Sequence, residues 1–167
     1  MSSTYLIALG SNRRHWLYGP PIGVVHAAME EMAVLGTVSA RSPIMSSMPI
    51  GPAQRRFANA ACVLESEYAP DALLTGLKRL EREFGRRAGQ NWGDRVLDLD
   101  IILWSAGVWA SGTARRAYLE IPHYAYRQRS FVLDPASTIA PNWRDPITGL
   151  TITHLNARLT KPRRLPR

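Results

Sequence analysis

Residues 95–104 read RVLDLDIILW, a segment with the length and composition of a buried β-strand. Side chains two residues apart along a strand point to the same face of the sheet. Asp98 and Asp100 would therefore present two carboxylates side by side, roughly 7 Å apart, while the apolar residues around them anchor the strand. Two negative charges held this close need a counter-charge.

Carboxylate oxygens are hard ligands that suit Mg²⁺, which usually takes one or two of them and completes its shell with water and substrate phosphates. The pair Asp98 and Asp100 is consequently compatible with a site for a metal–nucleotide complex. An isolated Asp-x-Asp pair is also explained by solvent exposure or by surface ion pairs with arginine. Its neighbours in the sequence have to discriminate between these two interpretations.

Arginines precede the acidic pair at Arg86, Arg87 and Arg95, in a segment punctuated by glycine. Guanidinium groups can bind phosphate oxygens through two parallel hydrogen bonds and offset charge that develops during transfer. A glycine-rich segment of this kind can close over a bound substrate. The same composition also describes an ordinary exposed basic loop.

A second polar cluster follows Pro122, where His123 and Tyr124 stand shortly before Arg127 and Arg129. These side chains can donate hydrogen bonds to phosphate oxygens. A lone histidine is more often structural, and the other histidines show no metal-ligand spacing with this one.

Phe57 and Asn59 stand near the start of another predicted strand. An aromatic face and an amide could together bind a flat heterocycle by stacking and edge recognition. Most such pairs belong to a core and a turn.

The hydrophobic periodicity and the Pro/Gly punctuation divide the chain into short elements. The expected elements are, in order, a strand at 4–9, a helix at 21–36, strands at 37–44 and 59–68, a helix at 70–85, a strand at 95–104 and a short terminal helix at 151–158. This order predicts an α+β fold, a ferredoxin-like sandwich with a mostly antiparallel sheet and helices packed on it.

The chain has 167 residues and a formal net charge of +8. We expect one domain over residues 1–160, followed by a basic C-terminal tail at 161–167. The positive charge favours anionic partners such as nucleotides or nucleic acid. The longest uncharged run is shorter than the roughly 18 residues of a membrane-spanning helix. With no secretory signal pattern and Cys62 as the single cysteine, the sequence predicts a cytoplasmic protein.

Neither the G-x-x-x-x-G-K-[ST] loop nor the G-x-G-x-x-G motif occurs, which disfavours the standard nucleotide-binding folds. The chain instead resembles the 6-hydroxymethyl-7,8-dihydropterin pyrophosphokinases of folate biosynthesis over most of its length. The segments that carry the resemblance are YLIALGSN (5–12), PIGPAQRRFANAACVLE (49–65), LEREFGRR (80–87), WGDRVLDLDIIL (92–103), IPHYAYRQRSFVL (121–133) and IAP (139–141).

The resemblance implies transfer of pyrophosphate from MgATP to the hydroxymethyl group of a reduced pterin, with release of AMP. It implies that two Mg²⁺ ions bind at Asp98 and Asp100 and that Arg86 and Arg95 neutralise the triphosphate; these four are the expected catalytic residues. Further positions expected to contact ATP are Glu81, Ile101, His123, Tyr124 and Arg129. Phe57 and Phe131 would sandwich the pterin, and the other residues expected around it are Ser47, Pro49, Ile50, Asn59 and Trp92.

The chain departs from the family pattern mainly in its glycine-rich segment. Asp94 replaces a usual proline, Asn91 replaces a usual basic residue, and the stretch 85–92 is one residue short. Glu120 stands where a small polar residue is common. These departures leave open a homologue that binds nucleotide or pterin without catalysis.

A second alternative is an RNA-binding module, because the positive charge and a ferredoxin-like layout are shared with RNA-recognition domains. Against it, the aromatic signature of those domains is missing and two carboxylates repel a phosphodiester. The expected partners are therefore ATP and the hydroxymethyldihydropterin, with no nucleic acid and no membrane, and the expected state is a monomer.

Overall fold

A computed structural model describes residues 1–48, 55–85, 95–113 and 116–161 of the chain. The strands are β1 (Ser3–Ser11), β2 (Thr37–Arg41), β3 (Met45–Ser47), β4 (Phe57–Ser66), β5 (Asp98–Trp104), β6 (Trp109–Thr113) and β7 (Arg116–Ile121). The α-helices are α1 (Pro21–Glu31), α2 (Pro70–Glu83), α3 (Ser130–Ile139) and α4 (Ile152–Thr160), with short 3-10 turns η1 (Met32–Val34) and η2 (Tyr126–Gln128).

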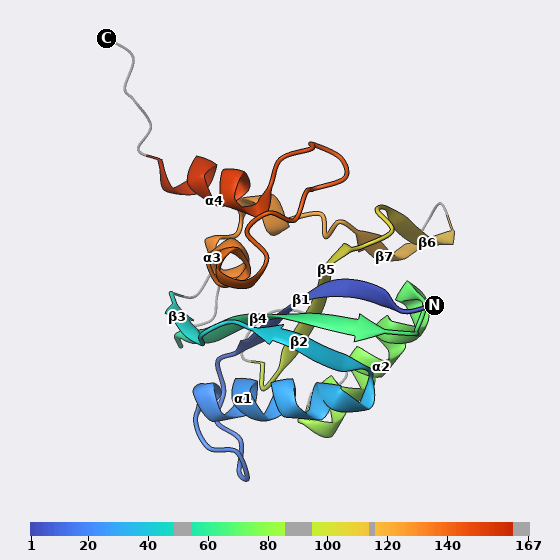
Figure 1. Ribbon diagram of the computed structural model, residues 1–167. Helices are drawn as coiled ribbons and strands as arrows, with labels where there is room; N and C mark the ends of the chain where they lie inside the picture. Colours follow the sequence, from blue (N-terminus) through green and yellow to red (C-terminus); the bar gives the residue numbers. More distant parts are fainter. Residues whose placement is uncertain (49–54, 86–94, 114–115, 162–167) are drawn as a thin grey trace.

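The main sheet has the strand order β2-β4-β1-β5, with β3 also paired to β4, and its neighbouring strands are antiparallel. In Figure 1 the helices α1 and α2 cover one face of this sheet, and α3 and α4 lie over the other. A separate antiparallel hairpin, β6–β7, extends beyond the end of β5. The expected α+β fold with helices on a mostly antiparallel sheet is confirmed.

Strand β1 shows why the sheet is covered on both faces. Its residues alternate between two apolar cores, so that Tyr5, Ile7 and Leu9 pack with α1 and α2, whereas Leu6 packs with α3 and α4. A strand that is buried on both faces consists of a continuous run of apolar residues, and this run is what predicted the strand from the sequence.

Helix α2 follows the expected apolar stripe. Leu73, Leu77 and Leu80 are buried against the sheet, Pro70 occupies the first turn, and Gly85 stops the helix with φ +100. This helix also brings the buried side chain of Glu81 beneath β5.

Several elements differ from the sequence prediction in extent, and β3, β6, β7 and α3 were not predicted. Helix α1 ends at Glu31 instead of residue 36, β2 ends at Arg41 instead of residue 44, and β5 begins at Asp98 instead of residue 95. Strand β4 runs from Phe57 to Ser66 instead of 59–68. Pro135 lies inside α3, and a proline that removes a helical hydrogen bond normally argues against a helix. The terminal helix is confirmed as α4, whose N-cap Thr151 accepts a hydrogen bond from the backbone N–H of His154.

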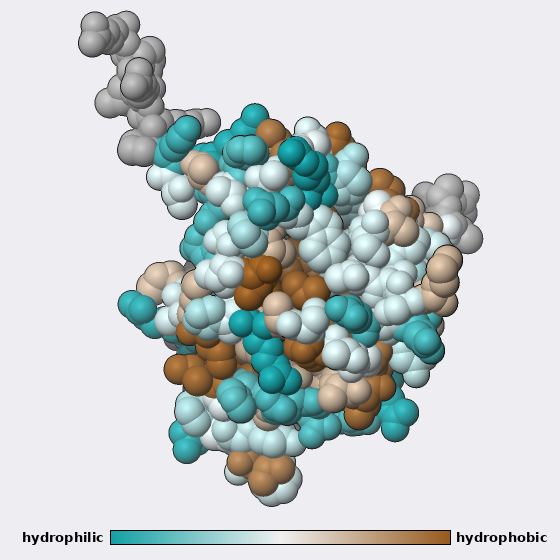
Figure 2. Space-filling model, viewed as in Figure 1, coloured by the Kyte–Doolittle hydropathy of each residue, from teal (hydrophilic) through white to brown (hydrophobic). Residues whose placement is uncertain are grey.

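Within the described ranges, no helix is long and apolar enough to cross a membrane. Apolar side chains reach the surface between the α3–α4 layer and the sheet on the face shown in Figure 2. The expected basic tail lies outside the described residues except for Lys161, and the single-domain assignment stays a prediction.

Candidate active site

The two aspartates lie on the side of β5 that faces α3. Leu97, Leu99 and Ile101 point into the core formed with α1 and α2, so the intervening Asp98 and Asp100 point the opposite way. Both carboxylates are partly exposed there. The alternation expected from the sequence thus brings the acidic pair together on one face.

Arg95 lies directly beside Asp98. Its Nη1 donates a hydrogen bond to Asp98 Oδ1 at 2.8 Å, and about a quarter of each side chain is exposed, 24% and 26% respectively. Asn12 fixes the backbone of Arg95 from two directions, since its Oδ1 accepts from Arg95 N at 2.7 Å and its own N–H donates to Arg95 O at 3.1 Å. Asn12 is not among the site residues expected from the sequence; the available signal was a polar amide directly after a buried strand.

Asp100 lies near the negative charges of Asp98 and Glu81. Burial, followed by the negative charge of Asp98, raises the pKa of Asp100 to about 6 against the opposing charges of Lys78 and Arg129. A divalent cation would relieve this repulsion, and the two carboxylates supply the hard oxygen ligands that Mg²⁺ prefers. The pair therefore fits a magnesium site.

The described residues contain no group of three or more His, Cys, Asp or Glu side chains placed to hold a metal ion. A cation at Asp98 and Asp100 would hence need further ligands from outside this set. Phosphate oxygens and water are the usual source for Mg²⁺, so the arrangement suits a metal that arrives with a nucleotide.

His123 is held next to Asp100. Its backbone N–H donates to Ile102 O at 3.0 Å, and its Nε2 lies 4.0 Å from Asp100 Oδ2. Burial, followed by the charge of Arg129, lowers the pKa of His123 to about 4, so the ring is neutral at pH 7. Because Nδ1 accepts a hydrogen bond from the backbone N–H of Ala125 at 3.2 Å, the proton belongs on Nε2. His123 consequently offers a neutral N–H donor to the site.

The remaining residues expected around ATP differ in accessibility. Tyr124 stacks on His123 with ring centroids 4.8 Å apart and is largely exposed, and Arg129 lies over the ring of Phe131 with its Cζ 5.6 Å from the centroid. Ile101 is buried in the core, and Glu81 is fully buried with Oε1 bonded to Leu99 N and Lys78 Nζ.

Arg127 does not join the phosphate cluster suggested by its position in the sequence. Its guanidinium engages both oxygens of the fully buried Asp145 through Nε and Nη2. Asp145 also accepts hydrogen bonds from Ile147 N and Thr148 Oγ1. This network attaches the turn η2, which lies between His123 and Arg129, to the loop before α4.

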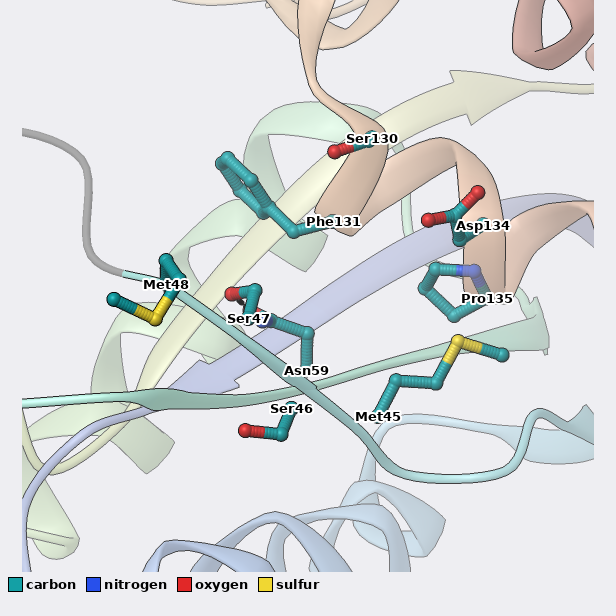
Figure 3. A pocket seen from close by; sticks show the side chains of 9 residues that line it. All are labelled: Met45, Ser46, Ser47, Met48, Asn59, Ser130, Phe131, Asp134 and Pro135. Carbon is teal, nitrogen blue, oxygen red and sulfur yellow. Dashed lines mark hydrogen bonds between the residues drawn. The ribbon is translucent and has the colours of Figure 1, made fainter. Parts of the chain in front are cut away.

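A pocket of about 250 Å³ opens between α3 and β3. Figure 3 shows Phe131 and Asp134 from α3 on one side, Met45 and Ser47 from β3 on the other, and Asn59 between them. The side chain of Asn59 is fixed there, because its Nδ2 donates to Ser47 Oγ at 2.5 Å. The structure thus brings together three of the residues expected around a pterin.

Phe57 is not among the pocket-lining residues, although it pairs with Ser47 across β3 and β4. Its expected stacking opposite Phe131 stays a prediction. Four of the expected site residues lie outside the described part of the chain: Pro49, Ile50, Arg86 and Trp92. The same holds for Asn91 and Asp94.

Gly10 connects the pocket to the acidic pair. It lies opposite Asn59 on β4 and opposite Asp98 on β5, so the amide and the carboxylate stand in one row across three adjacent strands. A Cβ at Gly10 would come within 3.3 Å of Asn59 Oδ1. In the sequence this glycine stands out only as part of the segment YLIALGSN, and its place between the two halves of the site follows from the strand pairing.

Comparison with known proteins identifies relatives of this chain. The profile of the family described as 7,8-dihydro-6-hydroxymethylpterin-pyrophosphokinase (HPPK) matches residues 6–141. The 2-amino-4-hydroxy-6-hydroxymethyldihydropteridine pyrophosphokinase of Pseudomonas aeruginosa is 38% identical over 143 residues, which cover 84% of this chain and 82% of the relative. The protein of the same name from Haemophilus influenzae is 36% identical over 140 residues, covering 82% and 81%.

Solved structures share the fold at low sequence identity. The Plasmodium falciparum HPPK-DHPS in complex with STZ-DHP has a TM-score of 0.75 and 11% identity, covering 95% of this chain and 43% of that chain. The wild-type protein with pteroate has a TM-score of 0.71 and 12% identity, and this chain spans 42% of its length. These likenesses support the fold, and the profile match and the two bacterial relatives show that the chain belongs to the HPPK family.

Proposed function

We propose that this chain transfers the pyrophosphoryl group of ATP to the hydroxymethyl group of 6-hydroxymethyl-7,8-dihydropterin and releases AMP. The observation that carries the proposal is the row formed by Asn59, Gly10 and Asp98. It puts a fixed amide in a pocket next to a pair of carboxylates suited to magnesium, so an alcohol and a metal-bound phosphate can meet.

In this proposal the pocket holds the pterin, with Asn59 reading its polar edge and Phe131 packing on its ring. This assignment is supported by Ser47 and Phe131, which line the pocket together with Asn59. Phe57 would stack on the opposite side of the ring. Pro49, Ile50 and Trp92 complete the proposed pterin site by resemblance alone.

The proposed ATP site lies across Asp98 and Asp100. Two Mg²⁺ ions bound there would neutralise phosphate charge and align the reacting oxygens. Arg95 lies beside Asp98, which supports a role for Arg95 at the triphosphate, and Arg86 is proposed as its partner. His123 would donate its Nε2–H to a phosphate oxygen, with Tyr124 and Arg129 beside it.

In the reaction the hydroxymethyl oxygen attacks the β-phosphorus and its proton passes to solvent, the bond between the α,β-bridging oxygen and that phosphorus breaks, and AMP leaves. Positioning and electrostatic stabilisation by the residues above would supply most of the acceleration. We also propose that the enzyme acts as a monomer in the cytoplasm. Cys62 is buried, so its thiol is not accessible for a disulfide between chains.

Family membership does not favour the RNA-binding alternative. The remaining alternative is a homologue that binds its ligands without catalysis. The reaction products distinguish it from an active enzyme. Purified protein is incubated with MgATP and hydroxymethyldihydropterin, and AMP, ADP and the pterin diphosphate are quantified by ion-pair chromatography. We expect equal amounts of AMP and pterin diphosphate, and none when the pterin is omitted. Folded protein that binds both substrates without forming AMP would support the non-catalytic homologue, and ADP would indicate a different transfer.

A further inference from the structure

Leu99 lies between the two aspartates on β5, which is the edge strand of the main sheet in the part of the chain that the structure describes. In the strand order β2-β4-β1-β5, strand β5 has β1 on one side and, among the described residues, no strand of the main sheet on the other. Backbone groups of successive residues in an antiparallel strand point to alternate edges. The N–H and C=O of Leu99 bond to α2 and hence point to the edge away from β1.

A single ion pair on α2 occupies both of these backbone groups. Glu81 Oε1 accepts from Leu99 N at 2.8 Å, and Lys78 Nζ donates to Leu99 O at 3.2 Å. Lys78 and Glu81 are joined by a contact of 2.8 Å between Nζ and Oε1. The pair, which we call the Leu99 clasp, takes the place of a neighbouring strand at one residue of β5.

Burying the charged groups of the Leu99 clasp costs desolvation free energy. The Glu81 side chain has 0% exposure and that of Lys78 only 32%. Desolvating two charges offsets much of their attraction, so a buried ion pair is a weak source of net stability compared with apolar packing. Charge-assisted hydrogen bonds do, however, fix geometry more tightly than apolar contacts.

We propose that Lys78 and Glu81 are positioning residues that set the separation and orientation of the Asp98 and Asp100 carboxylates for magnesium. The clasp holds the backbone of Leu99, and both aspartates are covalently attached to this residue. A shift of Leu99 would therefore move both carboxylates relative to each other. This inference rests on the proposed function of the acidic pair and gives Glu81 a role that acts through the strand.

The test compares Lys78→Met, Lys78→Arg and Arg79→Met with the unchanged protein. Methionine keeps much of the length of Lys78 and removes its charge and hydrogen bonds, whereas arginine keeps a cationic donor. Arg79 is the matched control because it lies next to Lys78 on α2, is 76% exposed and pairs with Glu83 at the surface. The two readouts are amide hydrogen exchange of Leu99 in ligand-free protein and Mn²⁺ binding with a non-hydrolysable ATP analogue, followed by electron paramagnetic resonance.

For Lys78→Met we expect faster exchange at Leu99 and weaker Mn²⁺ binding by about 10–100-fold, the range found when a group that orients a metal ligand is removed. Lys78→Arg should restore most of the affinity, and Arg79→Met should match the unchanged protein. Wild-type exchange and Mn²⁺ affinity in folded Lys78→Met would overturn the proposal. If that variant does not fold, Glu81→Gln, which keeps an acceptor for Leu99 N and removes the charge, gives the same comparison.

The kinetic readout separates positioning from a general loss of structure. A positioning defect raises the Mg²⁺ concentration needed for AMP formation and leaves the KM for the pterin unchanged; an equal loss in both would contradict it. If the unchanged protein forms no AMP, the proposed function fails, while Mn²⁺ binding and Leu99 exchange still test the clasp.

Discussion

Asn59 on β4 and Asp98 on β5 flank a single residue of β1, Gly10, which pairs with both in the antiparallel sheet. A methyl group at this glycine would approach Asn59 Oδ1 to 3.3 Å, so the amide has to move by a few tenths of an ångström. We expect Gly10→Ala to raise the KM for the pterin about tenfold, or about 1.4 kcal/mol in binding free energy. Steady-state kinetics in both substrates measures this. An unchanged KM for the pterin, or an equal rise for ATP, would show that Gly10 does not shape the pterin pocket.

Arg95 Nη1 lies 2.8 Å from Asp98 Oδ1, in the region where the triphosphate is proposed to bind. Arg95→Met removes a preorganised cation while keeping an unbranched side chain. We expect the rate of AMP formation at saturating substrates to fall by about 100-fold, the lower range for loss of one electrostatic donor at a reacting centre. Arg79→Met serves as the control for loss of an α2 surface arginine. A rate within twofold of that of the unchanged protein would show that Arg95 does not contribute to catalysis.

His123 should titrate far below the ordinary range of a histidine. Burial and the charge of Arg129 lower its pKa to about 4, so its ring stays neutral as the pH falls from 7 to 5, and the protonated form appears only near pH 4. Nitrogen NMR of labelled imidazole in the ligand-free protein should show the proton on Nε2 and a midpoint near 4. A midpoint near 6.5 would mean that His123 is charged on entering the reaction at mildly acidic pH.

The pair Arg127–Asp145 should contribute to stability in a pH-dependent way. Although burial alone raises the pKa of Asp145, hydrogen bonds from Arg127, Ile147 N and Thr148 bring it below its usual value. This stabilisation is present above the unfolded pKa of about 3.9 and is lost as the pH falls toward the folded value. Asp145→Asn leaves Arg127 without its carboxylate, and we expect a loss of about 3–5 kcal/mol at pH 7.

Urea unfolding at pH 7 and at several values below pH 4 measures this prediction, with Asp71→Asn as a control for a surface acid at the start of α2. The difference between Asp145→Asn and the unchanged protein should shrink as the pH falls. A difference that is constant with pH would mean that Asp145 acts through packing alone.

Periodicity explains which parts of this molecule could be predicted from sequence. The apolar run of β1 and the stripe of Leu73, Leu77 and Leu80 are buried, and the spacing of these apolar residues along the chain is enough to predict it. Helix α3 could not be found this way, because Pro135 opposes a helix locally and the packing of Val132 and Leu133 on the sheet overrides it.

The same distinction applies to the site. Asp98 and Asp100 lie two residues apart on one strand, so their shared face follows from the sequence. The bond between Glu81 and Leu99 spans 18 residues and depends on how α2 packs beneath β5. Likewise Asn59 and Asp98 meet only because β4 and β5 both pair with β1, which no local pattern encodes.

Asp98 and Asp100 are proposed to carry the magnesium ions of a pyrophosphoryl transfer. A Mg²⁺ titration of AMP formation from ATP and hydroxymethyldihydropterin tests this, run in parallel for Asp98→Asn, Asp100→Asn, the control Asp71→Asn and the unchanged protein. We predict that each site variant loses at least about 100-fold in rate at every Mg²⁺ concentration, with Asp71→Asn unaffected. Full magnesium-dependent AMP formation by either folded site variant would contradict the account.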